Sequence, residues 1–154
     1  MSDEPDPSWW RRRWPLAGLA VLLVGLWGLH GAWIHEHRRG LGIEIDEGSY
    51  LIDAVRVAHG VTDGKPREVV AHYLGGGQQS APLLSAVTAP FLVVGSDSLG
   101  WALTAQLAVL ALLVVATFLL ARRLAGDRWA LLAAAVVGAA PGFVDYTRLY
   151  HLAL

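Results

Sequence analysis

The sequence predicts an all-α membrane protein whose chain crosses the bilayer as three helices. Of the 154 residues, 55% are apolar and only 16% are charged, and the mean hydropathy is +0.44. Soluble domains usually carry about 25% charged residues. The apolar residues also form long blocks that approach the roughly 20 helical residues needed to cross a hydrocarbon core about 30 Å thick. This composition therefore predicts lipid-embedded helices.

The same composition argues against several other classes of protein. A formal net charge of −1 is unlike that of a nucleic-acid-binding protein, so we expect no nucleic-acid partner. The chain contains no cysteine, which removes disulfide frameworks and cysteine zinc sites from consideration. The abundance of apolar residues argues against intrinsic disorder. The lipid bilayer is the partner that the composition predicts.

Three segments are predicted to span the membrane, at residues 16–34, 99–121 and 129–144. The first is apolar apart from His30, and the second carries only three polar residues. The third is shorter and gains length if its helix starts at Asp127, which could cap that start.

The first apolar segment could instead be a cleaved signal peptide, because the basic residues 11–13 precede it. Its apolar stretch is longer than the 7–15 residues typical of a signal peptide. It is also followed by His35-Glu36-His37 instead of a cleavage site with small residues. These two features favour an uncleaved membrane anchor.

The basic residues predict the orientation, because short cytoplasmic segments are enriched in Lys and Arg. They lie in the tail 1–15 and in the loop 122–128, so both segments are predicted to be cytoplasmic. The loop 35–98 and the end 145–154 are then extracytoplasmic, although Arg38 and Arg39 oppose this assignment. We expect a multi-pass protein of the plasma (inner) membrane with a cytoplasmic N-terminus.

The outer loop 35–98 is predicted to carry two short helices that rest on the membrane surface. The first covers residues 46–60, where Asp46 is a plausible cap and Gly60 a plausible stop. The second covers residues 82–94, which are apolar but too few to span, with Pro82 in the first turn. The apolar stripe of the first helix is predicted to consist of Leu51, Ile52, Val55 and Ala58.

Asp46 and Glu47 are the leading candidates for catalytic residues. A helix N-terminus keeps a carboxylate ionised through its free N–H groups and its dipole. An ionised carboxylate can act as a general base or help to hold a divalent metal ion. The alternative is that both acids only cap the helix, because acidic first turns are common. For His35-Glu36-His37 an interfacial role is favoured over metal binding, since histidines two apart on a helix diverge.

Arg148 is a candidate for binding phosphate, because its guanidinium presents a fork of donors. Asp145 or His151 could act beside it, and the alternative is an ordinary interfacial cluster of Tyr and Arg. His72 and Tyr73 could contact either a substrate or lipid headgroups.

Several short motifs accompany these predicted elements. They are Asp-Glu-x-x-Tyr at 46–50, Ala-Pro-Leu at 81–83, Phe-Leu-Val-Val-Gly at 91–95, Pro141 and Arg148. In this arrangement the chain resembles the N-terminal part of the GT-C glycosyltransferases, in particular the protein O-mannosyltransferase and aminoarabinose transferase group. The resemblance covers roughly residues 12–151.

The resemblance implies transfer of a sugar from a polyprenyl-phosphate donor to a glycan, lipid or protein acceptor on the outer side, with inversion. It implies that Asp46 acts as base or orients the acceptor, with Glu47 as its partner and Tyr50 lining the helix. Arg148 would lie near the donor phosphate, and a divalent metal ion is a possible cofactor.

The sequence departs from the family in two places. Gly100-Trp101-Ala102 stands where members often carry an Arg, and the chain reads Leu152-Ala153-Leu154 where a second acid commonly follows. Members are also much longer, so we expect a truncated piece, inactive on its own. Two other hypotheses remain open. One is a non-enzymatic small membrane subunit that docks a partner through its outer loop, and the other is a transporter fragment with polar residues such as Gln106 inside its spans.

Overall fold

The computed structural model describes residues 8–38, 45–74, 82–95 and 98–142. Within these ranges the chain is helical apart from short connections and contains no strand, which confirms the all-α prediction. The helices are α1 (Ser8–His37), α2 (Ile45–Thr62), α3 (Pro66–Leu74), α4 (Pro82–Val94), α5 (Leu99–Ala125) and α6 (Asp127–Ala139).

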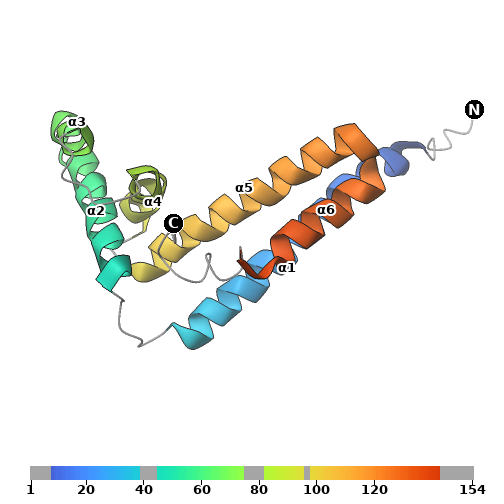
Figure 1. The fold of residues 1–154 in the computed structure, drawn as a ribbon, viewed down its shortest axis with the longest axis horizontal. Coiled ribbons are helices and arrows are strands. Elements are labelled where there is room, and N and C mark those ends of the chain that lie inside the picture. Colours follow the sequence, from blue (N-terminus) through green and yellow to red (C-terminus); the bar gives the residue numbers. More distant parts are fainter. Residues whose placement is uncertain (1–7, 39–44, 75–81, 96–97, 143–154) are drawn as a thin grey trace, which may run out of the picture.

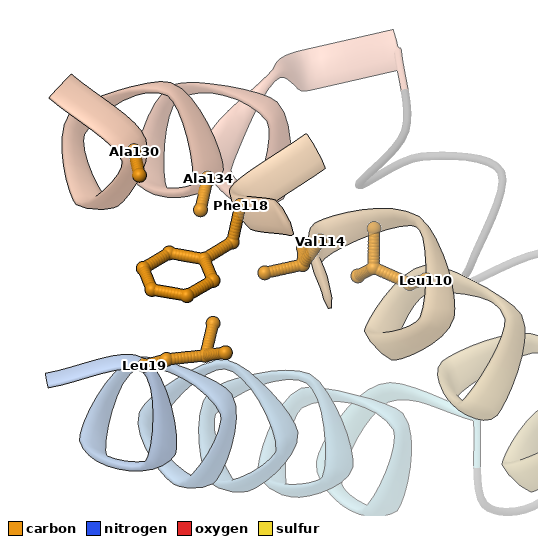
Figure 2. Close-up of a cluster of buried hydrophobic side chains, with 6 residues drawn as sticks. All are labelled: Leu19, Leu110, Val114, Phe118, Ala130 and Ala134. Carbon is orange, nitrogen blue, oxygen red and sulfur yellow. The ribbon is translucent and has the colours of Figure 1, made fainter. Parts of the chain in front are cut away.

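Helices α1, α5 and α6 lie side by side and form an elongated bundle (Figure 1). Helix α5 runs antiparallel to both of its neighbours, so the start of α1 lies beside the turn between α5 and α6. The core of the bundle is made by one face of each helix, and Figure 2 shows Phe118 of α5 between Leu19 of α1 and the alanines of α6. Small residues at 130 and 134 leave room for the Phe118 ring, which is fully buried.

Two of these helices, and not three, are long and apolar enough to cross a membrane. They are α1, over the 25 residues Arg13–His37, and α5, with 27 residues. Helix α6 has 13 residues, about 20 Å at 1.5 Å per residue, so the third predicted span is shorter than the sequence suggested. It ends at Ala139 because Ala140 takes an extended conformation before Pro141, as residues preceding proline usually do.

The turn between α5 and α6 is tighter than the predicted loop 122–128. Helix α5 continues to Ala125, and Gly126 alone separates it from α6. Gly126 has φ +86° and ψ 177°, a backbone conformation that residues other than glycine rarely adopt. Its N–H donates to the carbonyl of Arg122. Asp127 begins α6 as predicted but does not cap it, because its carboxylate accepts a hydrogen bond from Arg122 Nε at 2.7 Å.

The remaining helices extend from the opposite end of the bundle, where α2 and α4 pack against each other (Figure 1). The sequence predicted the bounds of α4 correctly and those of α2 within two residues. Of the predicted apolar stripe of α2, Ala58 is buried against α4, whereas Ile52 is 60% exposed. The buried residues between α2 and α4 are Ala54, Val57, Ala58, Ala89 and Leu92.

Helix α3 was not predicted, so the segment 35–98 carries three helices among its described residues instead of two. Its first turn follows Gly64, whose φ of +70° reverses the chain after α2. Helix α3 returns onto α2 where Gly60 faces Val69, and a side chain at position 60 would overlap the Val69 methyl group. The glycine that was predicted to end a helix therefore lies inside α2 and allows a close approach.

Candidate functional site

The first turn of α2 is held against the bundle by Tyr50. This side chain is 8% exposed and packs with Leu84 of α4 and with Ala102 and Leu103 of α5. Ile34 of α1 and Leu99 of α5 border the same cluster. Four helices therefore meet where α1 ends and α5 begins, and we call this place the junction. Tyr50 was predicted from the resemblance to line this helix as a substrate-binding residue; its side chain packs in the junction, and the substrate-binding role stays a prediction.

The backbone of Asp46 and Glu47 lies in the first turn of α2, within about one helical turn of Tyr50. This agrees with the prediction that the two acids open a helix. The structure thus brings this pair, at the level of the backbone, to the junction.

An open cavity of about 310 Å³ lies at the junction, between the end of α1 and the start of α5. Its described lining residues are Ile34, His35, Arg38, Leu99, Gly100 and Leu103. Three of these residues also belong to the surroundings of Tyr50, so the cavity adjoins the packing that holds α2. One wall is apolar, and the other carries the two basic side chains.

The end of α1 fixes the position of the basic wall. The N–H of Arg38 donates to the carbonyl of Ile34 at 2.9 Å, which continues the helical pattern one residue beyond His37. The His37 ring stacks on Trp33, with ring centroids 4.7 Å apart, and its Nδ1 lies 3.0 Å from the Trp33 carbonyl oxygen. His37 is thus engaged within α1, whereas His35 and Arg38 line the cavity.

Among the described residues, two further predicted site residues lie away from the junction. His72 and Tyr73 belong to the last turn of α3, which packs near the far end of α2 (Figure 1). Arg148 lies outside the described residues, as do Asp145 and His151.

A metal site is not apparent in the part of the chain that the structure describes. Within it, no group of three or more His, Asp or Glu side chains is arranged to hold a metal ion. The divalent cofactor therefore stays a prediction.

Arg38 and His35 are the residues that sequence reasoning missed. Both were noted only for their bearing on topology and on interfacial depth. Arg38 follows Ile34 by four residues, about one turn of α1. This spacing could have suggested that the two side chains share one face of the helix. The start of α5 lies across the cavity from this face of α1. That contact is a tertiary feature, and the local sequence pattern of α1 does not predict it.

Several polar side chains lie inside the helix assembly. His30 of α1 is 1% exposed and borders a small hollow between α1 and α5, together with Leu26, Leu107 and Leu110. Gln106 of α5 is 8% exposed. Both face the interior as the transporter hypothesis requires, but the hollow beside His30 has a volume of only about 10 Å³ and is too small to hold a solute.

Comparisons with protein-family models, with curated proteins and with solved structures found no match to this chain.

Proposed function

We propose that α1 and α5 cross a membrane and that α6 lies in the same bilayer beside them. The support is the exposure of their apolar side chains. In the most apolar 18-residue stretch of each helix, the buried share is 11% for α1 and 39% for α5. The core helix of a soluble protein is mostly buried instead. Helix α6 exposes Trp129, Leu132 and Val136. Lipid would remove this surface from water.

We propose that α1 stays attached as an anchor instead of being removed as a signal peptide. Its Leu19 contributes to the same core as Phe118, and its Leu26 fills the space over Gly138 of α6. Removal of α1 would expose this face of both partner helices. A segment that completes a core is a poor candidate for cleavage.

The proposed orientation rests on where the basic residues gather in the bundle. Arg13 near the start of α1 and Arg122, Arg123 and Arg128 around the α5–α6 turn belong to the same end. By the positive-inside rule this end faces the cytoplasm of a plasma (inner) membrane, and the junction faces the opposite side.

For the activity, we propose that the chain forms the N-terminal part of a glycosyltransferase that uses a polyprenyl-phosphate sugar. The observation that carries this proposal is that α2, whose first turn carries the acidic pair in its backbone, packs through Tyr50 on residues that also line a cavity with basic and apolar side chains. An acceptor hydroxyl needs a base, and a lipid phosphate needs cations at headgroup depth.

In the proposed reaction, the carboxylate of Asp46 orients the acceptor hydroxyl and accepts its proton. The hydroxyl oxygen then attacks the anomeric carbon as the bond to the lipid phosphate breaks. Glu47 supports Asp46, and Arg148 stabilises the negative charge on the departing phosphate. Further elements complete the site, and a divalent metal ion is a possible cofactor.

The test is sugar transfer from a polyprenyl-phosphate donor in membranes that contain the full-length protein. We expect Asp46→Asn to lower the rate by about 100-fold or more, the usual contribution of a general base. Asp53→Asn is the matched control on the same helix, because its carboxylate pairs with Arg56 at 3.3 Å. Undiminished transfer by Asp46→Asn would remove that residue from the mechanism. Loss of function only on changes at Leu51 or Val55 would favour the non-enzymatic subunit.

A further inference from the structure

We propose that the cavity at the junction binds the phosphate group of an anionic membrane lipid, with Arg38 as the principal cation. This proposal depends on α1 and α5 lying in a bilayer, but it does not depend on sugar transfer. The proposed glycosyltransferase would use the basic wall for the phosphate of its sugar donor; here the wall is assigned a membrane lipid that binds without sugar transfer, with Arg38 as its principal residue.

The first argument is the charge of the cavity wall. Arg38 and His35 both line it, and its described lining includes no acidic side chain. Arg offers five N–H donors in a planar fork, so it can hold two phosphate oxygens and still bond elsewhere. Because the main chain of Arg38 is tied to Ile34, the guanidinium extends from a fixed point at the cavity rim.

The second argument is the start of α5, which forms the opposite wall. The amide of Trp101 already donates to the Ser98 carbonyl at 3.2 Å. The amides of Leu99 and Gly100, at the first two positions of α5, have no carbonyl one turn earlier within the helix and favour a nearby anion. Ser98 precedes this helix in an extended conformation and makes no side-chain cap hydrogen bond to it. Gly100 lines the cavity, so no side chain keeps a ligand away from the backbone there.

The third argument favours a lipid over a free anion. Ile34, Leu99 and Leu103 give the cavity an apolar side, which a free phosphate ion would not need. A volume of about 310 Å³ suits a headgroup and its glycerol better than whole acyl chains.

The test measures lipid retention by purified protein in detergent, using native mass spectrometry after addition of phosphatidylglycerol. We expect one tightly held lipid on the wild-type protein and about tenfold weaker retention by Arg38→Gln, the loss of one charge-assisted contact. The matched control is Arg123→Gln, which removes the same charge from an exposed position near the other end of α5. It should retain the lipid as the wild type does.

A second variant keeps the charge but fills the space. A Cβ atom added at position 100 has only Ser98 Oγ near it, at 3.9 Å, so the backbone there accepts a side chain. We expect Gly100→Leu to fold, which a thermal unfolding curve checks. We expect it to lose the lipid as well. Equal retention by wild type and Arg38→Gln would overturn the proposal. Full displacement of the lipid by inorganic phosphate would also overturn it, because the ligand would then be a free anion. Either result leaves the Asp46→Asn test of sugar transfer unaffected.

Discussion

Thr88 and Ser85 are polar residues on the buried face of α4. Thr88 has no exposed surface and Ser85 is 1% exposed, and within the described part of the chain neither hydroxyl has a hydrogen-bond partner. A buried hydroxyl without a partner costs about 1–3 kcal/mol relative to one that is satisfied. These two residues therefore weaken the packing of α4, on which the position of α2 depends.

We predict that Thr88→Val stabilises the protein by about 1 kcal/mol, because it removes an unsatisfied group while keeping a branched side chain. The measurement is the midpoint of thermal unfolding in one detergent. Thr104→Val is the control, since the Thr104 hydroxyl donates to the Gly100 carbonyl at 2.8 Å and its removal should bring no gain. A lower midpoint for Thr88→Val would show that the hydroxyl has a partner, such as a buried water molecule.

At the scale of single helices, composition and spacing were good guides where the cause is local. Pro82 and Gly95 bound α4 as expected, and the long apolar run of α5 became one helix. The sequence could not reveal which face of α2 is buried. The close packing of α2 on α4 uses Ala54, whose small side chain carries a weak hydrophobic signal, and leaves Ile52 exposed.

The candidate site was predictable only in part, for the same reason. Asp46 and Glu47 were found because an acidic pair at a helix start is a local pattern. The cavity depends on the end of α1 meeting the start of α5, which lie more than 60 residues apart in the sequence. No periodicity within either helix reports that contact.

The α5–α6 turn provides a test at this scale. We predict that Gly126→Ala destabilises the protein by about 1–3 kcal/mol, because φ of +86° with ψ near 180° is essentially restricted to glycine. Denaturant unfolding in detergent measures the change. Gly28→Ala on α1 is the control, because a side chain there meets nothing within 4 Å. Equal stability of the two variants would mean that this turn can relax at little cost.

At the scale of the whole molecule, the packing of the bundle constrains its topology. Gly18 near the start of α1 faces Leu131 near the start of α6, and Leu26 faces Gly138 near its end. Helices α1 and α6 are therefore parallel, and α5 returns between the same two ends (Figure 1). In the proposed membrane arrangement, either orientation puts the start of α1 and the α5–α6 turn on one side of the bilayer, and the α2–α3 turn belongs to the other end of the molecule.

Single-cysteine labelling tests this arrangement, because the chain contains no cysteine of its own. The three positions are Ser8→Cys at the start of α1, Ala125→Cys at the α5–α6 turn and Asp63→Cys after α2. We expect a membrane-impermeant maleimide to label only Asp63→Cys in intact cells, and the other two after permeabilisation. Opposite sides for Ser8→Cys and Ala125→Cys would contradict the bundle itself. The reverse pattern for all three would keep the bundle but invert the proposed orientation, and would move the junction and its cavity to the cytoplasmic side.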